Sequence, residues 1–251
     1  MHDENPTVNQ PASVFRVRAH NTAPDSENKI HDDKVAVKYG FREGLVPGVT
    51  VYGYMVPAIL EQFGRGWLER GAVAFRLHLP CYQGETVVTR CDGPVVTAEN
   101  ENGSLYASGM VSMNEKSDGE PEVFPSYPLP EEDRRPVASA QTMVAGLPLG
   151  SIRQKLEAAE ETAIPERLLS LANEILVRNF RMSPWIHAGS EVRHQRRAKN
   201  GQEIAVSGVI QECFERKGRK FAVAALGISV HDDAGQLCTV ATVRHTFIYE
   251  L

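Results

Sequence analysis

Two residues three positions apart, Asn28 and His31, have side chains suited to acid–base chemistry. Imidazole titrates near neutral pH, so His31 is the best candidate for a group that takes and gives a proton. The amide of Asn28 is suited to holding a water molecule or orienting that ring. Asp25 is the candidate carboxylate nearby. An alternative stays open from residue types alone, namely that His31 and the two aspartates after it cap a short helix over residues 32–39.

A backbone amide at the start of an apolar helix is the second candidate group. The apolar segment Pro47–Phe63 is predicted to form this helix, with Pro47 in its first turn. Since proline has no N–H, Gly48 is the first residue that could donate to a negatively charged oxygen, with the helix dipole behind it. We expect Val46 and Tyr52 beside the same bound group. The alternatives are that Gly48 permits close contact of a helix with a sheet, and that Tyr52 is a core aromatic residue.

The composition is that of an ordinary folded protein. The chain has 251 residues, 42% of them hydrophobic and 24% charged, which suffices for one large core or two domains. A net charge of −5 argues against nucleic acid as a partner. The most apolar stretch, Leu45–Leu60, is too short to cross a bilayer, and the polar N-terminus does not read as a signal peptide.

Cysteine spacing and glycine patterns bear on compartment and cofactors. The four cysteines are far apart and form no Cys-x-x-Cys pair, which favours reduced thiols in a cytoplasmic protein over disulfides or a zinc site. Neither a Walker nor a Rossmann glycine pattern is present. We therefore expect no metal, no nucleotide cofactor and no membrane partner.

The two halves of the chain repeat. Trp67 and Trp185 each begin a segment with glycine four places later, at Gly71 and Gly189, and each segment continues through a strand-like stretch to a glycine-containing turn. The offset of the tryptophans, 185 − 67 = 118 residues, is the length of a small domain and suggests duplication rather than a solenoid.

Each repeat follows an apolar helix and leads into strands. The helix segments are Pro47–Phe63 and Pro165–Phe180. The strand candidates are 70–79, 85–91, 94–99 and 104–113 in the first half, and 187–198, 202–214, 219–231 and 236–249 in the second. A helix that is apolar nearly all round must be wrapped, so we predict an α+β protein in which each half curls an antiparallel sheet around its helix.

Four segments follow along the chain. Residues 1–13 are predicted to be a disordered leader and 14–114 the half with the candidate site. Five prolines and many charges in 115–139 indicate a linker, and 140–251 is the second half.

This layout resembles the double hot-dog fold of MaoC-like acyl dehydratases, a family that includes the (R)-specific enoyl-CoA hydratases. Its motif is an Asp, then Asn-Pro-hydrophobic-His and an acidic residue, followed by a glycine at the start of the central helix. The motif positions matched here are Asn28, Ile30, His31, Asp33 and Gly48. The family's catalytic Asp falls on Ser26, one residue from Asp25, and Lys29 replaces the proline.

The resemblance implies a hydro-lyase that hydrates an enoyl thioester or dehydrates the 3-hydroxyacyl thioester, carried on CoA or an acyl carrier protein. His31, Asn28 and Asp25 would be catalytic, Gly48 would bind the thioester oxygen, and no cofactor is needed. Two alternatives remain open: a hot-dog thioesterase, and a degenerate acyl-binding protein that has lost the carboxylate.

The second half contains no copy of the Asn-x-x-His motif, so we expect one site per chain, in a monomeric pseudodimer or a homodimer of it. Arg196 and Arg197 lead a basic cluster, with Arg216 and Arg219 in a nearby hairpin, that would bind CoA phosphates or be a solvated strand face. His187 lies outside any motif and is expected to be structural.

Overall fold

A computed structural model describes residues 13–113, 123–231 and 235–251. The first half contains β1 (Val14–Arg18), η1 (Lys29–His31), α1 (Asp33–Ala36), η2 (Val37–Tyr39), α2 (Gly48–Phe63), α3 (Trp67–Arg70), β2 (Gly71–Leu77), β3 (Thr86–Asp92), β4 (Val95–Glu99) and β5 (Leu105–Met113). The second half contains η3 (Glu132–Arg134), β6 (Pro148–Lys155), η4 (Glu161–Ala163), α4 (Ile164–Asn179), β7 (Ile186–His194), β8 (Glu203–Arg216), β9 (Arg219–His231) and β10 (Leu237–Glu250).

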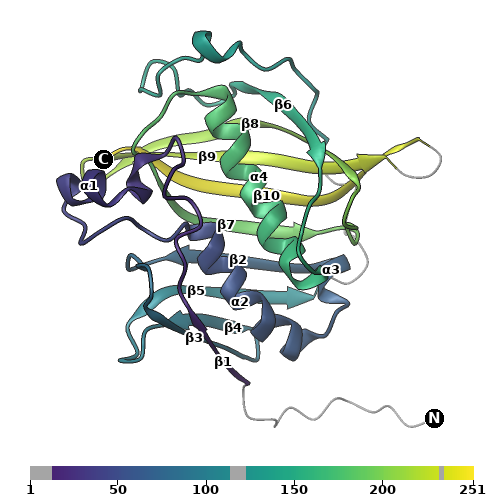
Figure 1. Ribbon diagram of the computed structural model, residues 1–251. Helices are drawn as coiled ribbons and strands as arrows, with labels where there is room; N and C mark the ends of the chain where they lie inside the picture. The colour runs from purple at the N-terminus through teal and green to yellow at the C-terminus, as the bar shows by residue number, and fades with distance from the viewer. Residues whose placement is uncertain (1–12, 114–122, 232–234) are drawn as a thin grey trace.

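The described strands form one antiparallel sheet in the order β1-β3-β4-β5-β2-β7-β10-β9-β8-β6. The two halves meet where β2 pairs with β7, with Ala72 opposite Arg193 and Arg76 opposite Gly189. The long helices α2 and α4 lie on the same side of this sheet and pack against each other (Figure 1). The fold therefore repeats one unit, a sheet curled around a helix, as the sequence predicted.

Two edge strands, β1 and β6, were missed by the sequence analysis. Each pairs with only one other named strand, β3 for β1 and β8 for β6, although Gly150 of β6 also forms an isolated bridge with Tyr127. β6 begins at Pro148; proline is tolerated at the first position of an edge strand because its missing N–H is not needed there. The first strand predicted in the second half, 187–198, corresponds to β7, which ends four residues before the predicted end, at His194.

The helix α2 is apolar on most sides because it is covered on most sides. It contacts β3, β4 and β5 of its own half, β7 of the other half, and α4. Its buried side chains belong to one large hydrophobic core that also contains Leu168 and Ile175 of α4. Within the described residues, no helix is long and apolar enough to span a membrane.

The described part of the predicted linker packs against the second half. Arg135 is 8% exposed, donates to the carbonyl oxygen of Val177 in α4, and pairs with Glu27 at 3.0 Å. This segment therefore helps to hold the loop before η1 in place. The rest of the predicted linker, 115–122, and the predicted leader apart from residue 13 lie outside the described residues, as does residue 114 at the end of the predicted first half.

Candidate active site

A cavity of about 970 Å³ is lined by residues of both halves. Four of the sequence candidates line it: Asn28, His31, Val46 and Gly48. The second half contributes residues that include Asn173, Trp185 and His187. The motif segment and the helix start of the first half therefore meet at one cavity, with the second half as its other wall.

His31 is held in the form of a base. Its Nδ1 lies 2.7 Å from the carbonyl oxygen of Leu45, so Nδ1 carries a proton and donates it. The neutral ring then carries no proton on Nε2, which accepts a long hydrogen bond of 3.4 Å from Nδ2 of Asn28. Burial lowers the pKa of His31, and the hydrogen bond to Leu45 opposes this with a smaller effect. The ring is therefore neutral at physiological pH, and Nε2 is available to accept a proton.

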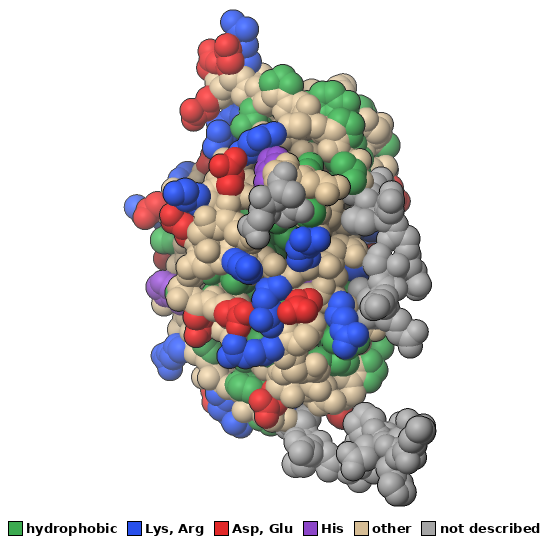
Figure 2. All heavy atoms as spheres, turned by 90° about the vertical axis from the view of Figure 1, so that its right-hand side faces the viewer, with side chains coloured by type: hydrophobic (Ala, Val, Ile, Leu, Met, Phe, Trp, Pro, Cys, Tyr) green, Lys and Arg blue, Asp and Glu red, His purple; other side chains and the backbone are tan. Residues whose placement is uncertain are grey.

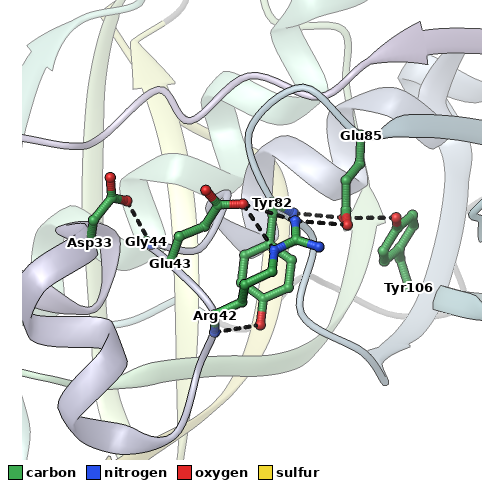
Figure 3. Close-up of polar contacts among 7 residues, drawn as sticks. All are labelled: Asp33, Arg42, Glu43, Gly44, Tyr82, Glu85 and Tyr106. Carbon is green, nitrogen blue, oxygen red and sulfur yellow. Dashed lines mark hydrogen bonds and ion pairs between the residues drawn. The ribbon is translucent and has the colours of Figure 1, made fainter.

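The loop that carries Leu45 is fixed to the motif segment. The backbone N–H of Leu45 donates to the carbonyl of Ile30 at 3.1 Å, and that of Gly44 donates to Oδ1 of Asp33 at 2.8 Å (Figure 3). A Cβ at Gly44 would lie 2.2 Å from the carbonyl oxygen of His31, so only glycine allows this approach. The acidic residue of the motif thus positions the loop that holds the histidine ring.

A second set of contacts fixes the same loop from outside. The guanidinium of Arg42 lies over the ring of Tyr82, 4.2 Å from its centroid, and pairs with Glu85 at 3.0 Å (Figure 3). The hydroxyl of Tyr106 donates to Glu85 at 2.8 Å. These groups tie the loop to the start of β3 and to β5, so the cavity wall has little freedom to shift.

Asn28 joins the two halves. Its Oδ1 accepts from the backbone N–H of Trp185 at 3.1 Å, and its Nδ2 donates to the Trp185 carbonyl at 3.0 Å. The same Nδ2 lies 3.4 Å from Nε2 of His31. Asn28 therefore lies within hydrogen-bonding distance of the His31 ring and also links the two halves, a structural role that the sequence analysis did not predict.

Replacing this clamp should cost stability. We expect Asn28→Ala to lower the free energy of unfolding by about 2–4 kcal/mol, because it removes two buried hydrogen bonds and leaves the backbone groups of Trp185 unpaired. Urea unfolding measures the change. Asn102→Ala, in an exposed turn, is the control and should stay within about 0.5 kcal/mol of wild type. An Asn28→Ala variant as stable as the control would contradict the clamp.

The start of α2 lies against His187 of β7. A Cβ on Gly48 would lie 2.3 Å from Cδ1 of Leu77 and 2.7 Å from Nδ1 of His187. The close approach of helix and sheet that was the alternative explanation for Gly48 is therefore present. It does not compete with the functional one, because the Gly48 N–H, in the first helical turn, has no intrahelical acceptor and borders the cavity.

Four sequence candidates lie elsewhere. Asp25 is exposed and lies outside the cavity lining, while Tyr52 is fully buried, stacked on Phe75 with ring centroids 5.1 Å apart. Tyr52 faces the sheet because it is one turn beyond Gly48 on the side of α2 that packs; Val51 lines the cavity instead. Burial raises the pKa of the Tyr52 hydroxyl.

Arg196 and Arg197 also lie outside the cavity lining, in the loop after β7. Arg197 pairs with Glu69 at 3.3 Å and with Glu161 at 3.2 Å, and Arg196 is exposed. On the molecular face seen in Figure 2, basic and acidic side chains lie side by side rather than in a basic patch. This loop fits the solvated reading better than phosphate binding, because β7 ends at His194 and the cavity lies toward its other end.

The cavity lining also contains Asn173, which the sequence analysis missed, and two arginines that it placed only in the basic cluster, Arg216 and Arg219. Asn173 of α4 has a buried Oδ1 that meets no partner in the described part of the chain. Arg216 and Arg219 of the β8–β9 hairpin line the cavity, whose described carboxylates are Glu191 and Glu212. Among the described residues no cluster of three or more His, Cys, Asp or Glu is placed to hold a metal ion.

Comparisons with known proteins find solved structures of the same fold. No protein-family model and no curated protein matches the sequence. A conserved hypothetical protein from Mycobacterium tuberculosis, described as having a double hot-dog fold, is 14% identical with a TM-score of 0.66, covering 96% of each chain.

Two further structures resemble the whole chain. A variant of the GphF dehydratase is 14% identical with a TM-score of 0.62, covering 100% of this chain and 96% of its own. A Lactobacillus plantarum protein provisionally described as an oleoyl thioesterase is 12% identical with a TM-score of 0.53, covering 97% and 98%. With the duplicated sheet and helix described above, these likenesses show that the chain has a double hot-dog fold.

Proposed function

We propose that this protein is an acyl-thioester dehydratase or hydratase, acting between a 3-hydroxyacyl and an enoyl thioester. The observation that supports this most is the shared cavity of His31 and Gly48. A neutral imidazole with an unprotonated Nε2 and a free helix N-terminal amide are the base and the oxyanion donor that this chemistry requires. The dehydratases among the structural neighbours agree with the proposal.

In the dehydration direction, Nε2 of His31 removes the proton from C2 of the substrate. The electron pair of that C–H bond forms an enolate, whose oxygen accepts a hydrogen bond from the Gly48 N–H. As the enolate collapses, the double bond forms between C2 and C3, and the C3–O bond breaks. The imidazolium returns its proton to the departing hydroxide, which leaves as water. Hydration follows the same steps in reverse.

One histidine serves both steps in this proposal because no carboxylate of the described residues makes a hydrogen bond with its ring. Asp25, the expected second group, is exposed outside the cavity lining. The described carboxylates of the lining, Glu191 and Glu212, are exposed residues of β7 and β8.

The same observation favours a second candidate, thioester hydrolysis. A lone neutral base beside an oxyanion donor can also activate water for attack on the thioester carbonyl. Product analysis with crotonyl-CoA separates the two: hydration consumes the enoyl group and leaves the thioester intact, whereas hydrolysis releases a free thiol. Binding without turnover, unchanged in His31→Ala, would instead favour a degenerate acyl-binding protein and overturn both.

We place the phosphate end of the substrate at Arg216 and Arg219. These residues are directly opposite each other across the β8–β9 turn, and like charges so placed repel. None of the ion pairs in the described part of the chain involves Arg216 or Arg219. A row of side chains on neighbouring strands leads toward them from Trp185: Ile186, Ile248, Phe221 and Phe214, all lining the cavity. Three strand spacings, roughly 14 Å, separate the ends of this row.

Neutralising the arginine pair tests this placement. We expect Arg216→Gln with Arg219→Gln to raise the KM for crotonyl-CoA roughly tenfold at low salt, about 1.4 kcal/mol, and to leave kcat unchanged. Crotonyl-pantetheine, which has no phosphate, should show no such change. Arg196→Gln is the matched control and should behave as wild type. An equal effect of Arg196→Gln, or none in the double variant, would move the phosphate site away from the hairpin.

A further inference from the structure

Three side chains of the second half form a buried hydrogen-bonded chain. Nε2 of His187 lies 2.8 Å from Oγ of Ser190, and the same Oγ lies 2.9 Å from Nδ1 of His245. The two imidazole rings stack with centroids 4.2 Å apart, and all three residues are buried. The ring of Phe75 meets His187 edge-on at 5.7 Å, so the orientation of His187 is fixed by packing as well as by hydrogen bonding.

Each end of this chain is an unpaired nitrogen. Nδ1 of His187 and Nε2 of His245 are buried and have no hydrogen-bond partner among the described residues. Both rings are neutral at physiological pH, because burial lowers the pKa of His187 to about 3 and lowers the pKa of His245 well below its usual value. Each ring therefore carries one proton.

Three arrangements of the protons keep both hydrogen bonds. In one of them both rings donate to Oγ of Ser190, and the hydroxyl proton then finds no acceptor among the described residues, so two arrangements remain. In the first, Nε2–H of His187 donates to Ser190, which donates to Nδ1 of His245; the unpaired N–H is then Nε2–H of His245. In the second, Nδ1–H of His245 donates to Ser190, which donates to Nε2 of His187; the unpaired N–H is then Nδ1–H of His187. The arrangements differ in where the unsatisfied donor lies.

The surroundings favour the second arrangement. His245 is 0% exposed and is not among the described residues that line the cavity, so an N–H there would stay unsatisfied in every state of the enzyme. His187 lines the cavity, and its Nδ1 lies against Gly48 at the start of α2. A donor at that nitrogen can be satisfied by an oxygen atom of a ligand, which removes the cost of leaving it unpaired.

We infer that Nδ1–H of His187 is a second hydrogen-bond donor to the thioester oxygen, acting together with the Gly48 N–H. The inference rests on the proposed function and adds a catalytic residue from the half that lacks the motif. It also supplies what the helix start cannot, because Pro47, the residue before Gly48, has no N–H. The neutral ring would stabilise the enolate without becoming charged, and Ser190 and His245 would hold the required tautomer.

The tautomer can be measured in the unaltered protein. Nitrogen-15 NMR of protein labelled at histidine distinguishes a protonated Nδ1 from a protonated Nε2. The inference requires that His187 carry its proton on Nδ1 and that His245 do the same. A His187 protonated on Nε2 would overturn it without any variant having to fold.

Two substitutions of His187 distinguish loss of the Nδ1–H donor from loss of the hydrogen bond between Nε2 and Ser190. Gln places its amide near the position of Nε2 and can retain the bond to Ser190, whereas Asn places its amide near Nδ1. We expect His187→Gln to lower kcat about 10²-fold, as the loss of one oxyanion donor does, and His187→Asn to retain more of the activity. His194→Gln is the matched control, since His194 is buried on the same strand and lies outside the cavity lining.

A bound 3-oxoacyl thioester reports the oxyanion site directly, because its enolate has an ultraviolet band. In wild type and His194→Gln we expect the bound enolate to form at lower pH than in solution. In His187→Gln it should form on the order of two pH units higher, which is the 10²-fold loss expressed as a pKa. Equal values in all three proteins, with binding intact, would overturn the inference alone. Failure of the wild type to bind any acyl thioester would overturn the proposed function.

Discussion

His31→Ala is expected to lower kcat for crotonyl-CoA hydration by about 10²–10⁴-fold, the usual contribution of a positioned general acid–base group. The loss should fall on kcat more than on KM, because the ring contacts the proton being transferred and the binding cavity remains. The free energy of unfolding should change by only about 1–2 kcal/mol, since the ring makes one short hydrogen bond, to Leu45, and one long one, to Asn28. Steady-state kinetics and urea unfolding of the same preparation measure both quantities.

The pH dependence gives the same experiment a second readout. Burial lowers the pKa of His31 below its ordinary value of 6.5, and hydration and dehydration both need the ring to change its protonation state. In the dehydration direction the free enzyme must be neutral at Nε2, so kcat/KM should fall only when the pH drops below that lowered pKa. This acidic limb should disappear in His31→Ala.

His20→Ala is the matched control, because His20 is an exposed histidine of the same half outside the cavity lining. It should retain wild-type kinetics and the acidic limb. Added imidazole should restore part of the activity of His31→Ala by occupying the vacated space. Unchanged turnover in His31→Ala would refute the assignment of His31 as the base, whatever the products are.

What the sequence could predict here is what lies close together along the chain. Asn28 and His31 are three residues apart, and Gly48 at the helix start follows His31 by 17 residues, so a local sequence pattern was enough to group them. The central helices and most strands were found for the same reason, because hydrophobic periodicity is a local signal. The edge strands β1 and β6 were missed because a strand paired on one side only has a weaker pattern.

The second half's contribution to the site depends on contacts that no local pattern encodes. Asn28 and Trp185 are 157 positions apart, and His187 reaches Gly48 only because β2 and β7 pair in one register. The proposed phosphate site likewise moved from Arg196 and Arg197 to Arg216 and Arg219 because of where β7 ends and which residues of the β8–β9 hairpin line the cavity. Since the motif matched only the first half, His187 was read as structural, although it lines the cavity.

The buried histidines should also make the fold sensitive to acid. Burial lowers the pKa of His187 to about 3 and that of His194 to about 4, and it lowers the pKa of His245 as well. In the unfolded chain each ring titrates near 6.5, so below that pH the unfolded state binds more protons than the folded state. Stability is therefore complete above pH 6.5 and falls as the pH decreases toward the folded-state values.

At pH 5, His187 and His194 should each lower the free energy of unfolding by about 2 kcal/mol, because each of the 1.5 pH units below 6.5 corresponds to about 1.36 kcal/mol. His245 acts in the same direction, so together the rings remove a large part of the stability of a typical domain, and we expect unfolding between roughly pH 4 and 5.5. The slope of the unfolding free energy against pH, from urea titrations between pH 5 and 6.5, counts the protons taken up. His194→Gln should reduce that slope by about one proton at pH 5. Stability independent of pH over this range would mean that the three rings are charged or solvated in the folded protein, and the tautomer argument for His187 would fail with it.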